Sequence, residues 1–244
     1  AGFTWPKVGY LWDGMVAYLL GAGVAHQIRN PLNSIHMIAQ VLCRKLDLPE
    51  EVREQARHIG DESGRIEEIV RQFLTFAKPR EPVFEKLDLA LLVREVVDLQ
   101  AAALASEDLT FSAYAPGLEA EVDRQFVIEV LENLLRNAAQ ALAGQGKVLV
   151  SLIASGDGAE IVVADNGPGV SEIDRDRIFD LYYTTRPEGT GLGLSLTAQM
   201  VSAMGGLLTL DSEPGLDNRG ARFVVRLPLR RISDEQGRLK EDSV

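Results

Sequence analysis

Two asparagines four residues apart, Asn133 and Asn137, lie in a stretch whose apolar residues recur at helical spacing. Four residues make about one turn of an α-helix, so both amides point to the same side of it. Two parallel amide oxygens are suited to coordinate hydrated Mg²⁺ or to bond phosphates, because Mg²⁺ prefers oxygen ligands and retains several waters. Asparagines on a solvated helix face are also ordinary, so the pair has two interpretations. The apolar face opposite consists of Val127, Leu131, Leu134, Leu135, Ala138 and Leu142.

A second polar segment, Asp165-Asn166-Gly167-Pro168-Gly169, directly follows a predicted strand. One interpretation is a tight turn, in which glycine supplies a positive φ. The other is a binding loop. Asp165 would then accept a hydrogen bond from an exocyclic amine, while Gly167 and Gly169 allow a base to lie against the backbone.

A third segment, Gly189-Thr190-Gly191-Leu192-Gly193-Leu194, opens a predicted helix. Glycines here leave backbone N–H groups and the helix N-terminus free to hold phosphates. The polar residues Thr184, Thr185 and Arg186 precede it. This arrangement is typical of a lid that closes over a nucleotide, with Arg186 as a phosphate contact.

One of the three histidines, His26, lies early in the chain on a predicted helix, away from that helix's apolar stripe. Asn30 lies one turn further on the same side, and Pro31 follows it. The ordinary interpretation of such a residue is a solvated surface histidine. The stripe consists of Val24, Ile28, Leu32, Ile35, Ala39, Leu42 and Leu46.

The sequence pattern around His26 predicts a helical hairpin. Helical periodicity extends over about residues 14–46 and again over 50–77, with a break at Asp47-Leu48-Pro49. Two long helices joined by a short turn form an antiparallel pair. One pair cannot cover its own apolar stripe, so we expect a homodimer whose two hairpins form a four-helix bundle. Prolines and charges at 78–82 then predict a linker.

The second half of the chain predicts helices on one face of a mixed sheet. Asp88 is expected to cap a helix over 89–103, and Asp123 a helix that ends at about Leu142 before Gly144. The overall fold class is α+β with two domains, a helical hairpin followed by a two-layer α/β sandwich. The other expected elements are short strands at 109–113 and 118–122 around an Ala-Pro-Gly turn, a hairpin of 148–153 with 160–164, a helix over 194–204, and strands at 207–210 and 221–227.

Composition limits the class of protein. The net charge of −11 argues against a protein whose main task is coating nucleic acid or anionic lipid. The single cysteine, Cys43, permits no internal disulfide and favours a reducing compartment. No apolar run approaches the roughly 18 residues that span a bilayer. We expect a cytoplasmic fragment without membrane contact of its own, whose parent protein is either soluble or membrane-anchored.

Together, the motifs Asn-x-x-x-Asn, Asp-x-Gly-x-Gly and Gly-x-Gly-x-Gly resemble the ATP-binding fold shared by sensor histidine kinases, gyrase-type ATPases, mismatch-repair ATPases and a heat-shock chaperone. With Ala25-His26-Gln27-Ile28-Arg29-Asn30-Pro31-Leu32 ahead of them, residues 20–229 resemble the transmitter portion of a bacterial sensor histidine kinase. The resemblance implies ATP and Mg²⁺ as ligands, a homodimer, and a response regulator receiver domain as partner. It also implies four parts: a lead-in at 1–20, a dimerisation and phosphotransfer hairpin at 21–80, a catalytic ATP-binding domain at 81–230 and a charged tail at 231–244.

The resemblance also implies residue roles. His26 would accept the phosphoryl group, Asn133 and Asn137 would hold Mg²⁺ and phosphates, and Asp165 would bind the adenine amine. The superfamily's ATP hydrolases have a water-activating glutamate where Asn133 stands, so transfer to a protein histidine is favoured over hydrolysis. The remaining ATP-binding positions are Gly167, Gly169, Tyr182, Thr184, Thr185, Arg186, Gly189, Gly191, Leu192, Gly193 and Leu194.

One residue departs from the family pattern. Gln27 stands where an acid usually follows the histidine, and an amide is no base at neutral pH. Losing general-base help costs about 10²–10⁴ in rate, so slow autophosphorylation is expected. Asn30 fits the position associated with dephosphorylation of the partner. The alternatives are therefore a phosphatase-biased transmitter, or a nucleotide-binding dimeric scaffold with weak autokinase activity.

Overall fold

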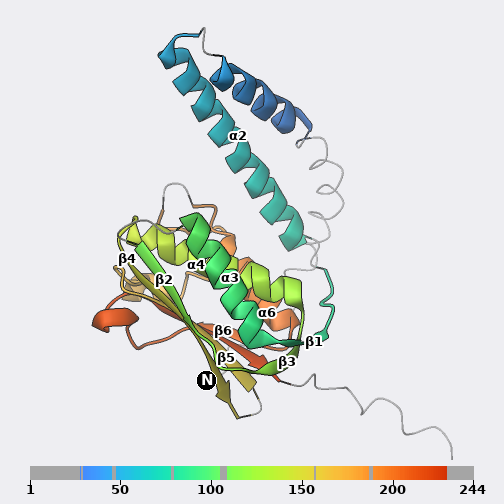
Figure 1. Ribbon diagram of the computed structural model, residues 1–244, viewed down its shortest axis with the longest axis vertical. Helices are drawn as coiled ribbons and strands as arrows, with labels where there is room; N and C mark the ends of the chain where they lie inside the picture. The colour runs from blue at the N-terminus through green and yellow to red at the C-terminus, as the bar shows by residue number, and fades with distance from the viewer. Residues whose placement is uncertain are drawn as a thin grey trace, which may run out of the picture. The chain divides into compact units, whose positions relative to one another are not determined.

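The computed structural model describes residues 28, 30–45, 48–77, 80–104, 109–156, 158–186 and 189–229. The chain divides into two compact units, Ala1–Arg80 and Glu81–Val244. The first is helical and the second combines a sheet with helices (Figure 1). Within the described ranges, no helix has the length and apolar character needed to cross a membrane.

The helical unit is the predicted antiparallel pair. Residues 30–44 are helical, and the second helix is α2 (Glu50–Ala77). Ser63 Oγ donates to Leu32 O at 2.9 Å, and His36 Nδ1 donates to Gly60 O at 3.1 Å. The later residue on the first helix, His36, pairs with the earlier residue on α2, Gly60. The two helices therefore run antiparallel. The part of the predicted 14–46 helix that precedes residue 28 lies outside the described residues.

Small residues line the contact between the two helices. Ala39 and Ala56 are each 2% exposed, and a Cβ added to Gly60 would lie 3.5 Å from the Ala39 Cβ. The helices therefore approach closely, while larger apolar residues point away from the pair. Those exposed residues are Ile28, Ile35, Met37, Ile38, Val41, Val52, Ile59, Ile66 and Ile69. The helix-pair contact thus covers only part of the apolar stripe.

The second unit is built on a five-stranded mixed sheet with strand order β2-β4-β5-β7-β6. β2 pairs with β4 in parallel, and the other neighbours are antiparallel. A separate antiparallel pair joins β1 (Glu85–Asp88) to β3 (Glu119–Val122). The five strands of the larger sheet are β2 (Leu109–Tyr114), β4 (Gly146–Ser155), β5 (Gly158–Asp165), β6 (Leu207–Leu210) and β7 (Arg222–Pro228).

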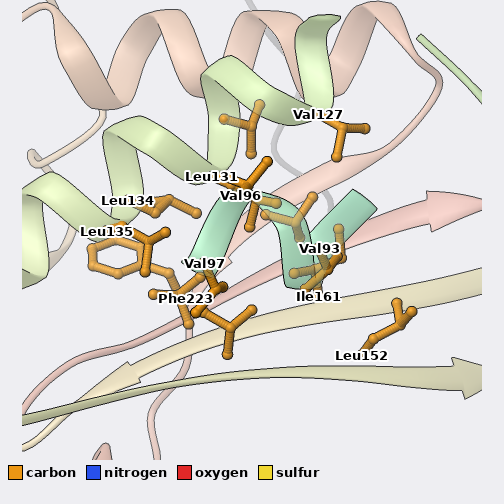
Figure 2. Close-up of a cluster of buried hydrophobic side chains, with 14 of the residues drawn as sticks. Val93, Val96, Val97, Val127, Leu131, Leu134, Leu135, Leu152, Ile161 and Phe223 are labelled. Carbon is orange, nitrogen blue, oxygen red and sulfur yellow. The ribbon is translucent and has the colours of Figure 1, made fainter. Parts of the chain in front are cut away.

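Helices α3 (Leu89–Leu104), α4 (Arg124–Leu142) and α6 (Gly193–Ala203) pack on this sheet (Figure 1). Figure 2 shows the core between them, where valines of α3 and leucines of α4 meet Leu152, Ile161 and Phe223 of the strands. Leu131, Leu135, Leu152 and Ile161 are fully buried. Each such side chain stabilises the fold by about 1.5–3 kcal/mol, so burial of this face holds the layers together.

Most predicted elements of this unit, including the two short strands, are confirmed within a few residues, and the structure adds how the strands pair. The strands at 109–113 and 118–122 do not pair with each other around the Ala-Pro-Gly turn. β2 lies beside β4, and β3 pairs with the unpredicted strand β1. Strand order depends on which faces are buried, and a turn between two short strands does not fix it. The short helix α5 (Glu172–Arg175) and the 3₁₀ turn η1 (Leu216–Asn218) were also not predicted.

Asp123 fixes the start of α4, as predicted. Its Oδ1 accepts a hydrogen bond from Phe126 N at 2.9 Å, and its Oδ2 accepts one from Val83 N at 2.6 Å. The carboxylate is 2% exposed. It therefore caps the helix and also ties it to the segment that enters the domain. The helix ends at Ala143 and Gly144, whose φ values of 49° and 88° are left-handed.

We expect Asp123→Ala to lower the free energy of unfolding by about 2–3 kcal/mol, because a cap is lost and Val83 N–H loses its acceptor. Asp123→Asn keeps one acceptor and should lose less. Urea denaturation monitored by circular dichroism measures both. Equal losses for the two variants would contradict the two-bond role of this carboxylate.

Candidate functional site

The polar face of α4 carries the predicted asparagine pair, and both side chains are partly buried. Asn133 Nδ2 donates to Thr197 Oγ1 of α6 at 2.7 Å. Its Oδ1 lies 2.7 Å from where a Cβ on Gly193 would stand. Within the described residues, the Asn137 side chain makes no hydrogen bond to the protein. One amide is thus anchored, and the other is free for a ligand.

Asp165 ends β5 with a buried carboxylate that is 4% exposed. Its Oδ1 accepts hydrogen bonds from Gly167 N at 2.8 Å and Ala221 N at 3.2 Å. Among the described residues, no protein group donates to Oδ2. Two backbone donors therefore orient the carboxylate and leave one oxygen for a ligand's N–H.

Burial raises the pKa of Asp165 above its usual value. The two backbone hydrogen bonds lower that pKa, and so does the nearby positive charge of Arg186, but burial has the larger effect. A buried acceptor of this kind is costly when it is only partly satisfied. The carboxylate therefore favours a ligand that donates a hydrogen bond to it.

The chain around Asp165 requires glycine at several positions. A Cβ on Gly220 would lie 2.0 Å from Asp165 O, and one on Gly215 would lie 2.1 Å from the same oxygen. Gly169 has a φ of 75°, and a Cβ added to it would lie 3.1 Å from Gly220 O. A Cβ on Gly167 would lie 2.9 Å from Asp165 Oδ1. The loop before β7 therefore lies directly against the Asp165 turn.

Asn166 is a site residue that the sequence interpretation did not single out. Its Oδ1 accepts a hydrogen bond from Lys147 N at 2.8 Å, and its Nδ2 donates to Asp217 Oδ2 at 3.1 Å. It is 6% exposed. Asn166 thus joins the start of β4 to η1 and holds the turn that presents Asp165. Its place inside the glycine-containing motif was the only available signal.

The predicted lid stretch folds onto itself. Thr184 Oγ1 accepts from Arg186 N at 3.1 Å, and a Cβ on Gly189 would lie 2.2 Å from that hydroxyl oxygen. Gly191 has a φ of 67°, and a Cβ added to it would clash with the Tyr182 backbone. Tyr182 itself has a φ of 63°. Tyr182 and Thr185 are exposed. Residues 187 and 188 lie outside the described residues.

Arg186 connects this stretch to α4. Its Nη1 donates to Gln140 Oε1 at 2.6 Å, and its Nη2 donates to Asn137 O at 3.0 Å. Burial lowers the pKa of Arg186, while the charge of Asp165 acts in the opposite direction. The Arg186 guanidinium therefore links the lid stretch to α4, and its charge interacts with the buried Asp165 carboxylate. Gln140 was not predicted as part of this cluster.

The lid stretch leads into α6, whose N-cap residue Leu192 provides no side-chain cap. The N-terminal N–H groups of a helix without such a cap favour an anion. Leu192 is 1% exposed, and Leu194 packs against the core. Both were predicted among the ATP-binding positions. Their side chains belong to the core, so the peptide backbone is their contribution to a site.

A further network holds the segment before the lid. Ser171 Oγ donates to Asp174 Oδ2 at 2.6 Å, and Tyr183 OH donates to Asp174 Oδ1. These bonds lower the pKa of Asp174, and the bond to Asp174 raises the pKa of Tyr183. The Arg177 guanidinium lies 4.3 Å from the centroid of the Tyr183 ring. Tyr183 is thereby fixed at the entry to the lid.

The structure thus connects the three predicted motifs of the second unit through Arg186, Asn133 and the glycines. The predicted residues His26 and Gln27 lie outside the described residues. Asn30 is exposed, and its carbonyl accepts a hydrogen bond from Ser34 Oγ at 3.1 Å.

Two family models match the two units. Residues 19–82 match the His Kinase A (phospho-acceptor) domain. Residues 122–231 match the family of histidine kinase-, DNA gyrase B-, and HSP90-like ATPases. The order of the two domains and the contacts among the motifs define a histidine kinase transmitter.

Curated relatives and solved structures agree with this class. Sensor histidine kinase ZraS of Escherichia coli K12 is 34% identical over 86% of this chain and 45% of its own length. Nitrogen regulation protein NtrY of Azorhizobium caulinodans is 33% identical over 85% of this chain and 28% of its own. The chain thus spans about half the length, or less, of these relatives.

Two crystal structures cover both units. Full-length ShkA in complex with AMPPNP superposes with a TM-score of 0.72 at 27% identity, covering 86% of this chain and 46% of ShkA. Histidine kinase ThkA in complex with response regulator TrrA gives a TM-score of 0.66 at 27% identity, covering 91% of this chain and 64% of that chain. The chain belongs to the bacterial sensor histidine kinases of two-component systems.

We expect Asp165→Asn to be at least as stable as the parent chain at pH 7 without ligand. The amide keeps the Oδ1 acceptor, and it removes the charge that burial disfavours. Because the folded-state pKa of Asp165 is raised, protonation stabilises the parent chain as pH falls through that pKa. The advantage of the amide should therefore shrink at low pH. Asp165→Ala, which leaves two backbone donors unpaired, should lose about 1–3 kcal/mol.

Thermal unfolding of the three chains at pH 7 and pH 5 measures these differences. A loss of stability in Asp165→Asn that is larger at pH 7 than at pH 5 would contradict the assignment of burial as the dominant effect.

Proposed function

We propose that the chain is an ATP-dependent protein-histidine kinase, which transfers the γ-phosphoryl group of ATP to His26 and then to an aspartate of a response regulator. The observation that carries the proposal is the buried Asp165 carboxylate, oriented by two backbone donors and open at Oδ2. The residues around it offer contacts for both ends of an adenine nucleotide, the base and the phosphates.

The base end of the nucleotide is assigned to Asp165. The exocyclic amine of adenine is an N–H donor, and Oδ2 is a buried acceptor to which none of the described residues donates. Glycines at 167, 169, 215 and 220 keep the surrounding backbone close and free of side chains. A buried acceptor discriminates strongly against a ligand that lacks the matching donor, because its desolvation is then uncompensated.

The phosphate end is assigned to the start of α6 and to α4. The uncapped N-terminus of α6 favours negative charge. The amide oxygens of Asn133 and Asn137 fit the oxygen-ligand preference of Mg²⁺, which neutralises phosphate charge when bound. Arg186 donates to Asn137 O, and this contact supports the assignment of its guanidinium to the phosphates in place of the Gln140 side chain.

The first unit supports a homodimer. Nine large apolar side chains of the two helices described in this unit are exposed on a single chain, among them Met37 at 65% and Ile38 at 61%. Such a stripe is typical of a helix that packs against another helix. Two hairpins would bury these residues in a four-helix bundle, the arrangement expected of a phosphoacceptor domain.

The acceptor chemistry needs little from the protein. A neutral imidazole is nucleophilic near pH 7, and most of the catalytic effect in phosphoryl transfer comes from positioning and charge stabilisation. With Asn133 in the position of the hydrolases' glutamate, the site offers no base there for water. Transfer to His26 is therefore favoured over hydrolysis.

A second function is favoured by two residues. Gln27 cannot act as a base, and Asn30 is exposed on its helix in the position associated with dephosphorylation. These residues support a transmitter that removes phosphate from its regulator faster than it loads His26.

We predict that the purified chain, incubated with γ-labelled ATP and Mg²⁺, acquires acid-labile and alkali-stable label. His26→Ala should remove that label, because the nucleophilic imidazole is lost, while ATP binding measured by titration stays unchanged. Gln27→Glu should raise the labelling rate by about tenfold or more, since a carboxylate can accept the second imidazole proton.

Three results separate the alternatives. Label that persists in His26→Ala would overturn the phosphoacceptor assignment. ATP binding without label in the parent chain or in Gln27→Glu would favour the scaffold. Rapid loss of phosphate from a pre-phosphorylated regulator, dependent on Asn30, would favour the phosphatase.

A further inference from the structure

Thr197, a residue of α6 outside every motif, contacts the asparagine helix. Its side chain is buried at 2% exposure. Thr197 Oγ1 donates to Gly193 O at 2.9 Å within its own helix, and it accepts from Asn133 Nδ2 at 2.7 Å. The hydroxyl therefore links the start of α6 to α4.

A hydroxyl group has one proton to donate. In Thr197 that proton is used by the Gly193 carbonyl, so only the oxygen lone pairs face Asn133. The Asn133 amide must then direct its NH₂ group at Thr197. Its Oδ1 is then the end nearer to Gly193 at the start of α6, 2.7 Å from where a Cβ on Gly193 would stand, against 3.2 Å for Nδ2.

The two ends of an amide are almost the same size, so packing alone distinguishes them poorly. Chemistry distinguishes them strongly, because an oxygen can ligate a cation and an NH₂ group cannot. A flipped Asn133 would direct a donor at the very place where the proposed function needs an oxygen.

We propose that Thr197 is a positioning residue for the metal–phosphate end of the site, which fixes the Asn133 amide with its oxygen toward the ligand. The inference rests on the proposed function, since it names how one of its Mg²⁺-holding residues is oriented. Packing between α4 and α6 does not by itself require a hydroxyl at this position. A valine would fill the same space.

The test compares ATP affinity in Mg²⁺ with ATP affinity in EDTA, measured by titration calorimetry on the intact chain. Thr197→Val keeps the shape and removes the acceptor. We expect it to reduce the gain in affinity that Mg²⁺ gives by about tenfold or more, with affinity in EDTA little changed. Thr197→Ser retains the hydroxyl and should restore the gain.

Ser195→Ala is the matched control. Ser195 Oγ also donates to a carbonyl of its own helix turn, Leu192 O at 2.9 Å, and the residue is 9% exposed. It lacks a bond to Asn133. Its removal therefore reproduces the loss of a buried helix hydroxyl and should leave the Mg²⁺ gain intact.

A double-mutant cycle provides the second test. In the Asn133→Asp background both ends of the side chain are oxygens, so orientation no longer matters. Thr197→Val should then have no effect on the Mg²⁺ gain. An effect of equal size in both backgrounds would overturn the proposal.

Other outcomes are equally decisive. Equal losses in Mg²⁺ and EDTA, or a matching loss in Ser195→Ala, would show that Thr197 only packs. If Thr197→Val lowers the melting temperature below the assay range, Thr197→Ala takes its place with the same expected result. Failure of the parent chain to bind ATP would instead contradict the proposed function. That result differs from failure of the Thr197 proposal, in which the parent chain binds ATP but Thr197→Val leaves the Mg²⁺ gain unchanged.

Discussion

The buried carboxylate of Asp165 is the constraint on which the second unit depends. Burial raises its pKa, and the two backbone N–H groups that bind Oδ1 act in the opposite direction, together with the charge of Arg186. One of those donors, Ala221 N, belongs to the residue just before β7. The glycines at 215 and 220 permit that approach, and Asn166 fixes the turn between them and β4. A stable fold and a ligand-ready oxygen therefore come from the same contacts.

The α4 helix connects this carboxylate to the rest of the site. Its apolar face is fixed in the core by Leu131, Leu135 and their neighbours, so its polar face has a defined direction (Figure 2). Along that face, Asn133 meets Thr197 of α6, and Asn137 O meets Arg186 of the lid stretch. Both α6 and the predicted lid stretch are thus hydrogen-bonded to α4.

Local periodicity and capping explain what could be predicted from the sequence. The α2 and α4 helices and the β4–β5 hairpin have strong repeats with clear starts and stops, such as Asp123 and Gly144, and the structure has them. The pairing of β2 with β4 could not be predicted, because it depends on distant faces. The contacts of Thr197, Gln140 and Ala221 with the motifs were missed for the same reason. They involve a hydroxyl, an amide and a backbone group that carry no pattern of their own.

The most direct test of the account compares binding of ATP with binding of ITP to the intact chain in Mg²⁺. The two nucleotides differ at purine position 6, where ATP has an amine donor and ITP an oxygen acceptor. We predict that ATP binds at least about tenfold more tightly, because Oδ2 of Asp165 requires a donor. Asp165→Asn, which presents an NH₂ group instead, should shift the preference toward ITP. Equal affinities, with no shift in the variant, would contradict the assignment of this carboxylate to the base.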